Sequence, residues 1–387
     1  MNTISVYEDK YNRFEYKPIQ YEIEEISPIL ELYRYELIQQ IKKECTEYLL
    51  SNNIKIDINN IFPRWMMLQF HDSIYYIDPI IPWNGKNNSQ LQKDLYYLSH
   101  QKISLNKANE IINELQLNKK CNKAIRKIRK WMKMDIYHKQ VKELSIETFL
   151  HENMYVFTFV FQQKKYSYRL HKNIVHKMHD FYSGKKILNQ DFIQHVVCII
   201  IRYNTLESYN QQAAVLPSLY SFLYTKYHVH CELFASSINS HQLKYGSLYY
   251  DLEKTIGSVG NFFNITIQKG FYVANPPFDD TIMRNMSYRL VECLEKTTEP
   301  LSIFITIPEW DKIEYGGFDC LTILQTSGYI QYIEKVKRNR VIFYNYYEHT
   351  QKHLVNVYFI LMQNKEGIYA HPIAKEMKII LSRYFPY

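Results

Sequence analysis

The chain has 387 residues, more than one typical domain, so two domains or one enlarged domain are expected. Hydrophobic residues make up 46% of the chain, which excludes a wholly disordered protein. The formal net charge is +8, and this mildly basic balance fits a polyanionic partner without requiring one.

The 6 cysteines lie far apart and form no Cys-x-x-Cys pair, which predicts neither a zinc site nor a disulfide framework. A reducing intracellular compartment fits this usage best: the nucleus or cytoplasm, or a viral factory or virion for a viral protein. The first residues are polar, and no apolar run is long enough to span a bilayer. His171, His176 and His179 do not share one helical face, so no metal site is expected.

The first half of the chain predicts mainly helices. Residues 1–20 form either an ordered arm or a loose tail. Apolar spacing predicts helices over 22–52, 89–117 and 192–203, while a short β-branched segment, 54–62, is expected to end at Pro63. Aromatic alternation predicts paired strands over 148–161 and 166–170. We expect residues 1–190 to form a mainly helical, basic region that contacts RNA.

The densest charge cluster lies in this region and contains no acidic residue. Its members are Lys119, Lys120, Lys123, Arg126, Lys127, Arg129, Lys130 and Lys133. At helical spacing they form either a helix that contacts phosphates or a solvated face, and the sequence leaves both interpretations open. Arg126 and Arg129 are the candidate substrate contacts.

After Pro217 the pattern changes to alternating helices and strands. Helices are predicted over 219–227 and 281–295. Buried strands are predicted over 228–234, 264–267, 271–273, 301–307 and 354–362. Apolar strands that alternate with helices predict an α/β fold with a mostly parallel sheet, and we assign it to residues 191–387.

Three distinctive stretches stand where predicted strands end. They are Phe234-Ala235-Ser236, Asn275-Pro276-Pro277-Phe278 and Pro308-Glu309-Trp310. In sheets of this kind, ligands bind outside the carboxyl ends of the strands. The coincidence of three such stretches favours a binding site at that edge.

The second stretch, Asn275 to Phe278, is typical of enzymes that methylate a planar, conjugated amino group. The amine of adenine is a poor nucleophile because its lone pair is delocalised into the ring. The Asn275 side-chain carbonyl and the Pro276 backbone carbonyl can each accept one of its N–H bonds, which aims the lone pair at a methyl donor. The prolines fix the backbone and Phe278 offers a stacking face. The alternative is a Pro-Pro strand terminator beside a buried Phe.

Several blocks together resemble the phosphorylated-CTD-interacting factor family, the cap-specific adenosine N6-methyltransferases. The blocks are Arg202-Tyr203 with Leu216-Pro217, Glu232 to Asn239, Asp251-x-Glu253 with Gly257-Ser258-x-Gly260, Asn275 to Phe278, Ile307 to Trp310 and Met362-Gln363-Asn364. Ser237 stands where the family has Pro. No WW domain is evident in the N-terminal region, which suits a member from a giant DNA virus or a protist.

The resemblance implies a Rossmann-like class I methyltransferase core and S-adenosyl-L-methionine as cofactor. The cofactor would lie near the turn formed by Phe234, Ala235, Ser236 and Asn239. Asp251 or Glu253 would accept hydrogen bonds from its ribose, unless both are ordinary surface carboxylates. Asn275, Pro276, Pro277 and Phe278 would be the catalytic motif.

The implied substrate is capped mRNA, methylated at N6 of the adenosine beside a 7-methylguanosine cap. Glu309 and Trp310 are candidate cap readers, since a Trp face attracts a cationic ring, although Trp310 in a core and Glu309 on a surface would explain them equally well. Lys337, Arg338 and Arg340 are candidates for triphosphate and backbone contacts.

Two other functions remain compatible with the sequence. One is a non-catalytic RNA-binding protein that keeps a methyltransferase-like fold. The other is an N6-adenine methyltransferase acting on DNA or uncapped RNA, or a glutamine methyltransferase, because all present a planar amine or amide.

Overall fold

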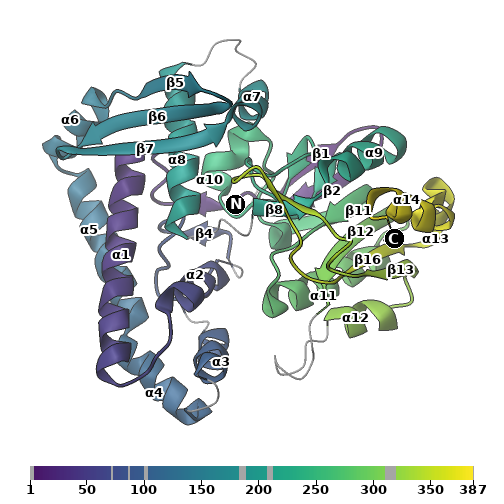
Figure 1. Ribbon diagram of the computed structural model, residues 1–387, viewed down its shortest axis with the longest axis horizontal. Coiled ribbons are helices and arrows are strands. Elements are labelled where there is room, and N and C mark those ends of the chain that lie inside the picture. The colour runs from purple at the N-terminus through teal and green to yellow at the C-terminus, as the bar shows by residue number, and fades with distance from the viewer. Residues whose placement is uncertain are drawn as a thin grey trace. The chain divides into compact units, whose positions relative to one another are not determined.

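A computed structural model describes residues 4–70, 73–85, 88–99, 103–182, 189–206, 212–309 and 320–386. The chain divides into two compact units. The helical unit is Ile19–Ser208, and the sheet unit combines Met1–Pro18 with Tyr209–Tyr387 (Figure 1). No helix among the described residues is both long and apolar enough to cross a membrane.

The helical unit contains eight α-helices among its described residues. They are α1 (Pro28–Ser51), α2 (Ile58–Leu68), α3 (Ser89–Leu98), α4 (Leu105–Leu115), α5 (Leu117–Met132), α6 (Asp135–Glu143), α7 (Lys172–Phe181) and α8 (Gln190–Thr205). Strands β5 (Glu147–His151), β6 (Met154–Phe161) and β7 (Lys164–His171) form an antiparallel sheet, and β3 (Gln20–Tyr21) pairs with β4 (Tyr75–Tyr76). The predicted strand pairing after residue 147 is therefore confirmed.

Prolines explain two boundaries in this unit. The helix expected from residue 22 begins at Pro28, where a proline at the first helical position loses no hydrogen bond. The expected stop at Pro63 was wrong, since α2 continues through it to Leu68. Pro63 lies inside α2, so the helix continues without the hydrogen bond that an N–H at this position would donate, while Asp57 caps its start by accepting a hydrogen bond from the Asn59 N–H.

A buried ion-pair network joins α1 to α8. Arg202 Nη2 lies 2.5 Å from Glu31 Oε1, and Arg34 Nη1 lies 2.6 Å from the same oxygen. Arg34 also donates from Nε to Asp78 Oδ2 at 2.9 Å. Two guanidinium groups and two carboxylates balance one another inside the helical unit, as buried charges require.

This network explains why the division between the units differs from the expected boundary at residue 190. Helix α8 follows that boundary in sequence, yet the Arg202–Glu31 pair holds it in the helical unit. The Arg202-Tyr203 block is thus a structural part of that unit, since Arg202 is fully buried.

The sheet unit contains an eight-stranded sheet with helices on both faces. Its strands are β1 (Ser5–Glu8), β2 (Arg13–Tyr16), β9 (Cys231–Glu232), β10 (Lys244–Tyr245), β11 (Ile265–Ala274), β12 (Leu301–Pro308), β13 (Ile330–Val336) and β16 (Val357–Gln363). A smaller sheet is built from β8 (Ala213–Val215), β14 (Phe343–Asn345) and β15 (Thr350–Lys352). The helices are α9 (Pro217–Tyr227), α10 (Tyr250–Glu253), α11 (Asp280–Lys296), α12 (Cys320–Thr326), α13 (Lys365–Ala370) and α14 (Met377–Tyr384).

The large sheet is mixed, and the α/β class is confirmed. Strands β10, β9, β11 and β12 pair in parallel, in that order. Strand β16 lies antiparallel between β12 and β13, so β13 runs in the same direction as β12. Strands β16 and β2 therefore run opposite to the other six. Because three of the described pairings in this sheet are parallel and four are antiparallel, the expectation of a mostly parallel sheet was wrong for the pairing of the strands.

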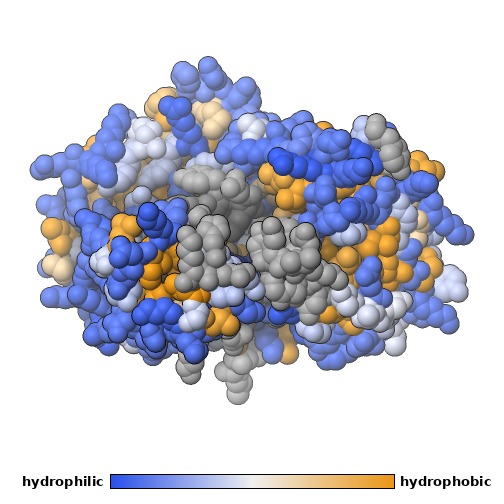
Figure 2. Space-filling view, turned by 60° about the horizontal axis from the view of Figure 1, so that its bottom comes forward, coloured by the Kyte–Doolittle hydropathy of each residue, from blue (hydrophilic) through white to orange (hydrophobic). Residues whose placement is uncertain are grey.

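Both faces of the sheet are packed with apolar side chains. On one face, Ile303 and Ile305 join Met286 and Leu290 of α11 in the main hydrophobic core. On the other, the Phe304 ring stacks on Phe359, and Phe359 stacks on Phe385 just after α14. Figure 1 shows α11 and α12 on one side of the sheet and α9 and α14 on the other. Figure 2 shows a largely hydrophilic surface with smaller hydrophobic patches.

The segment expected to be an arm or a tail is part of the sheet. Strand β2 pairs antiparallel with the first half of β11, where Ile267 faces Phe14. Strand β9 pairs in parallel with the second half, where Tyr272 faces Cys231. The two short strands predicted at 264–267 and 271–273 are thus one strand, interrupted by a bulge between Ile267 and Lys269.

Gly270 allows β11 to change partners at this bulge. Its φ is +122°, and a Cβ there would lie 2.3 Å from Asn12 Oδ1. Asn12 is fully buried and donates from Nδ2 to the His228 carbonyl at 3.2 Å. Only glycine meets both requirements, the positive φ and the close approach.

We expect Gly270→Ala to destabilise the sheet unit far more than Gly328→Ala. The first change combines backbone strain of about 1–3 kcal/mol with overpacking against Asn12 of about 1–3 kcal/mol. Gly328 also has positive φ, +78°, but nothing lies within 4 Å of an added Cβ, so only the strain applies. Urea denaturation of both variants measures the difference in free energy of unfolding. Equal losses would contradict the close-packing argument.

Candidate active site

The Asn275 to Phe278 stretch stands at the carboxyl end of β11, as predicted. Strand β11 ends at Ala274 and α11 begins at Asp280, so the motif forms the whole connection. Asp279 fixes it by donating its N–H to the Pro277 carbonyl at 2.7 Å, while its carboxylate caps α11 at the Ile282 N–H. A motif held between a buried strand and a capped helix has little freedom to move.

Phe278 and Asn275 of this motif differ in the contacts that their side chains make. Phe278 is half-buried, packs against the main core and meets Phe343 edge-on with ring centroids 5.9 Å apart. Asn275 Oδ1 is buried and has no hydrogen-bond partner among the described residues. A buried acceptor without a partner costs about 1–3 kcal/mol, so the oxygen is suited to receive an N–H from a bound molecule.

The predicted turn after β9 is built from its own polar side chains. Asn239 Oδ1 accepts from the Ser236 N–H at 2.7 Å and from Ser236 Oγ at 3.1 Å. Ser236 Oγ also donates to Gln212 Oε1 at 2.6 Å. Phe234 packs on Phe262 with ring centroids 4.8 Å apart, so its ring belongs partly to the core. These contacts give a rigid turn in place of a glycine-rich one.

The Ala235 N–H joins this turn to the glycine-containing loop that follows β10. It donates to the Gly246 carbonyl at 2.8 Å, and the Ser247 N–H donates to the Gly260 carbonyl at 2.8 Å. Ser247 and Ser258 share a hydroxyl hydrogen bond of 2.7 Å. The blocks around residues 236, 251 and 258 are therefore brought together, as their position in the sequence predicted.

The two carboxylates proposed for the ribose have different surroundings. Glu253 is fully buried and accepts from the Ser237 N–H at 2.5 Å, so its carboxylate serves the turn. Asp251 is also buried, with 4% of its surface exposed, and lies two residues earlier on α10. Neither is therefore an ordinary surface carboxylate.

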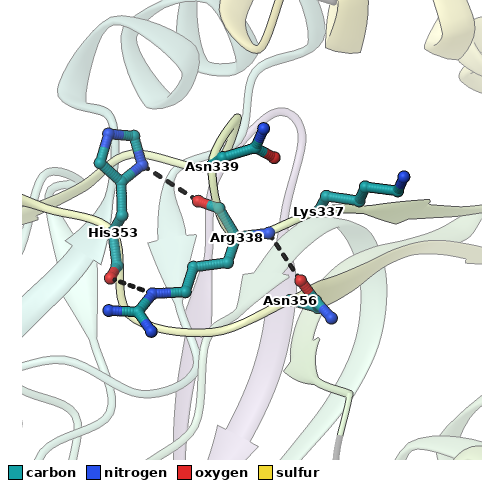
Figure 3. Close-up of a pocket in the computed structure, with 5 residues that line it drawn as sticks. All are labelled: Lys337, Arg338, Asn339, His353 and Asn356. Carbon is teal, nitrogen blue, oxygen red and sulfur yellow. Dashed lines mark hydrogen bonds between the residues drawn. The ribbon is translucent and has the colours of Figure 1, made fainter.

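A basic cavity of ≈ 570 Å³ lies beyond the ends of β13 and β16. It is lined by Lys337, Arg338, Asn339, His353 and Asn356, with no acidic residue in the lining (Figure 3). Arg338 donates from Nε to the His353 carbonyl at 2.9 Å, and its N–H donates to Asn356 Oδ1 at 2.7 Å. The Lys337 side chain extends away from this cluster (Figure 3).

Asn356 connects this cavity to the predicted cap reader Glu309. Asn356 Nδ2 donates to Glu309 Oε2 at 2.9 Å, and Lys335 Nζ lies 2.5 Å from Glu309 Oε1. The hydrogen bond from Lys335 is the main reason that the pKa of Glu309 falls below its usual value. Glu309, Lys337 and Arg338 are thus brought together, whereas Trp310 lies outside the described residues.

Arg340 binds the segment that follows α14 and does not line this cavity. It donates from Nη2 to the Phe385 carbonyl at 2.6 Å and from Nε to the Pro386 carbonyl at 3.0 Å. Its guanidinium therefore ties the segment after α14 to the loop after β13.

Arg126 and Arg129 belong to the helical unit, on α5. Both guanidinium groups lie over the Trp83 ring, 5.7 Å and 5.4 Å from its centroid. Arg129 also donates from Nε to Glu22 at 2.8 Å, while Lys120 pairs with Glu44 at 2.6 Å. Part of the basic cluster is therefore used in ion pairs, and Arg126 is the more exposed of the two arginines.

Two polar contributors were missed by the sequence: Gln212 and Asn356. Each is a single polar side chain outside any motif, and only the pairing of β8 with β14 or of β16 with its neighbours places it at the site. Among the described residues, no group of three His, Cys, Asp or Glu side chains is placed to hold a metal ion.

Comparisons with known proteins found a family model and relatives that match part of the chain. Residues 175–347 match the family model described as phosphorylated CTD interacting factor 1 WW domain. Two relatives are named mRNA (2'-O-methyladenosine-N(6)-)-methyltransferase: the mouse (Mus musculus) protein is 31% identical and the human (Homo sapiens) protein 30% identical, each over 125 residues. The match covers 31% of this chain and only 18% of either relative. The resemblance to the phosphorylated-CTD-interacting factor family is thus confirmed, with the family model matching residues 175–347.

Proposed function

We propose that the chain transfers a methyl group from S-adenosyl-L-methionine to N6 of the adenosine beside a 7-methylguanosine cap of mRNA. The observation that carries this proposal is the Asn275 side-chain oxygen, which is buried at the carboxyl end of β11 without a partner in the described part of the chain. The names of the mouse and human relatives support the same reaction.

Asn275 and Pro276 position the amine. The Asn275 oxygen accepts one N–H of the adenine amine and the Pro276 carbonyl accepts the other, so the nitrogen lone pair points at the methyl group. Phe278 stacks on the base, and its edge contact with Phe343 keeps the ring in place. Catalysis then consists mainly of positioning and exclusion of water, and the proton leaves after the amine has become cationic.

The turn after β9 is the proposed cofactor site. When bound there, S-adenosyl-L-methionine supplies an activated methyl group on a sulfonium. Parallel strands β10, β9, β11 and β12 with the site at their carboxyl ends support a Rossmann-like core. Ser236 and Asn239 hold the turn, Glu253 stiffens it through the Ser237 N–H, and Asp251 receives the ribose hydroxyls.

The basic cavity is the proposed site for the cap triphosphate. Lys337 and Arg338 supply positive charge, and Glu309 is held beside them through Asn356. Trp310 remains a candidate for stacking on the cap guanine. Arg126 of the helical unit is a candidate for further RNA phosphates, and an mRNA substrate implies an intracellular location.

A comparison of substrates tests this function directly. Methyl transfer to capped RNA beginning with adenosine should exceed transfer to the same RNA without a cap and to DNA of the same sequence. Equal transfer to all three would favour a general N6-adenine methyltransferase. Binding of RNA without any binding of S-adenosyl-L-methionine, measured by thermal shift, would favour the non-catalytic alternative.

We expect Asn275→Ala to lower kcat by about 10²–10³-fold, the usual effect of removing one preorganised hydrogen-bonding group. Binding of S-adenosyl-L-methionine should stay within about twofold, because the proposal assigns the Asn275 side chain to the amine and the cofactor to the turn after β9. Asn285→Ala, an exposed change on α11, is the matched control. Normal turnover in Asn275→Ala would disprove the mechanism.

The double variant Lys337→Ala, Arg338→Ala should raise KM for capped RNA without changing the affinity for S-adenosyl-L-methionine. Each lost phosphate contact should lower the slope of log K against log salt by about 0.7 for a single strand. Lys365→Ala removes an exposed charge from α13 and serves as the control. An unchanged salt slope in the double variant would remove the cavity from the RNA site.

A further inference from the structure

The small sheet β8–β14–β15 reaches both parts of the candidate active site. Its middle strand, β14, pairs with β8 so that Phe343 faces Val215 and Asn345 faces Ala213. At the start of β14, Phe343 meets Phe278 of the catalytic motif. Just after its end, the Tyr346 N–H donates to the Gln212 carbonyl at 3.2 Å.

Gln212 continues this connection to the cofactor turn. Its side-chain oxygen accepts from Ser236 Oγ at 2.6 Å. One residue, Gln212, therefore connects Tyr346 to the turn. Glu232, the last residue of β9, is near enough to raise the pKa of the Tyr346 phenol. The segment from Phe343 to Tyr346 extends from the base-stacking side of the site to the cofactor side.

The Tyr346 hydroxyl has no hydrogen-bond partner within the described ranges, although the side chain is only 8% exposed. Two more deeply buried tyrosines of the sheet unit do bond to the backbone: Tyr272 donates to the Lys269 carbonyl at 2.7 Å, and Tyr245 donates to the Ile256 carbonyl at 3.3 Å. The neighbouring Tyr344 hydroxyl bonds to His349 Nδ1. A buried hydroxyl without a partner destabilises a folded protein, so a ligand that completes it is favoured.

Burial raises the pKa of the Tyr346 phenol, with the nearby Glu232 and Tyr344 adding to the effect. The phenol therefore remains protonated at neutral pH and can donate a hydrogen bond. A buried donor of this kind suits a charged acceptor on a ligand.

The order of the strands indicates which part of the cofactor lies near Tyr346. Asp251, after β10, would hold the ribose, and Asn275, after β11, would hold the amine that receives the methyl group. Strand β9 lies between these two. The turn after β9, to which Gln212 connects Tyr346, would then lie beside the remaining part of the cofactor, its amino-acid end.

We propose that Tyr346 is a cofactor-binding residue whose hydroxyl hydrogen-bonds the charged amino-acid end of the methyl donor. This inference rests on the methyl-transfer function proposed above. It assigns a cofactor-binding role to a residue outside the blocks that carry the family resemblance.

Two ligands that contain adenosine distinguish binding of the amino-acid end from other roles of Tyr346. S-adenosylhomocysteine carries the amino-acid end, whereas 5'-methylthioadenosine has the same adenosine and sulfur but lacks it. Affinities of both are measured by isothermal titration calorimetry for the wild-type chain, Tyr346→Phe and the control Tyr344→Phe. We expect Tyr346→Phe to weaken S-adenosylhomocysteine by about tenfold or more and 5'-methylthioadenosine by less than about twofold. Tyr344→Phe should change neither.

The unfolding temperature without ligand supplies an independent measurement. Removal of an unsatisfied hydroxyl should leave the Tm of Tyr346→Phe unchanged or raise it. A lower Tm with equal loss of both ligands would show a structural role and overturn the inference, as would unchanged binding of S-adenosylhomocysteine. If the wild-type chain bound neither ligand, the proposed function itself would fail, an outcome distinct from a loss confined to the variant.

Discussion

Strand β11 is the element on which the sheet unit depends, because one of its edges is divided between two partners. Its first half pairs antiparallel with β2 and its second half pairs in parallel with β9. This change is possible only at a bulge followed by a residue with positive φ, which Gly270 supplies. Tyr272 closes the bulge by donating to the carbonyls of Lys269 and Arg13. The second half of β11 can then end at Asn275 beside the turn that follows β9.

The polar groups around the carboxyl end of β11 are of two kinds: some bond to the protein's own backbone, and others have no partner in the described part of the chain. Buried carboxylates satisfy backbone N–H groups: Glu253 accepts from Ser237, and Glu232 accepts from Gln242 at 2.7 Å. These bonds make the turns rigid, because a buried carboxylate left without them would be strongly unfavourable. Asn275 Oδ1 and the Tyr346 hydroxyl, by contrast, have no partner in the described part of the chain. A rigid support around a few unsatisfied groups is the arrangement that preorganised sites require.

The periodicity of apolar residues was sufficient to predict most helices and strands of both units. It also predicted the edge of the sheet at which the candidate site lies. Continuous apolar runs such as 301–307 and a helix pattern such as 281–295 depend on local residues, so β12 and α11 were predicted nearly to their ends. The pairing of β2 with β11 was not predictable, because it joins a short polar strand to one about 250 residues away in the chain and depends on one glycine. For the same reason a motif could suggest Arg340 for RNA, while only the fold shows its bonds to Phe385 and Pro386.

The reversed strand β16 explains how the basic cavity comes to lie at the same edge as the Asn275 to Phe278 stretch. In a wholly parallel sheet, only the carboxyl ends of strands meet there. Because β16 runs antiparallel between β12 and β13, its first residues lie beside the last residues of both: Val357 faces Pro308 on one side and Val336 on the other. Asn356, one position earlier, can therefore bind Glu309 after β12 and the Arg338 N–H after β13 at once. The reversed direction of β16 thus brings Glu309 and Arg338 close together, next to a cavity in which either residue could contact a ligand.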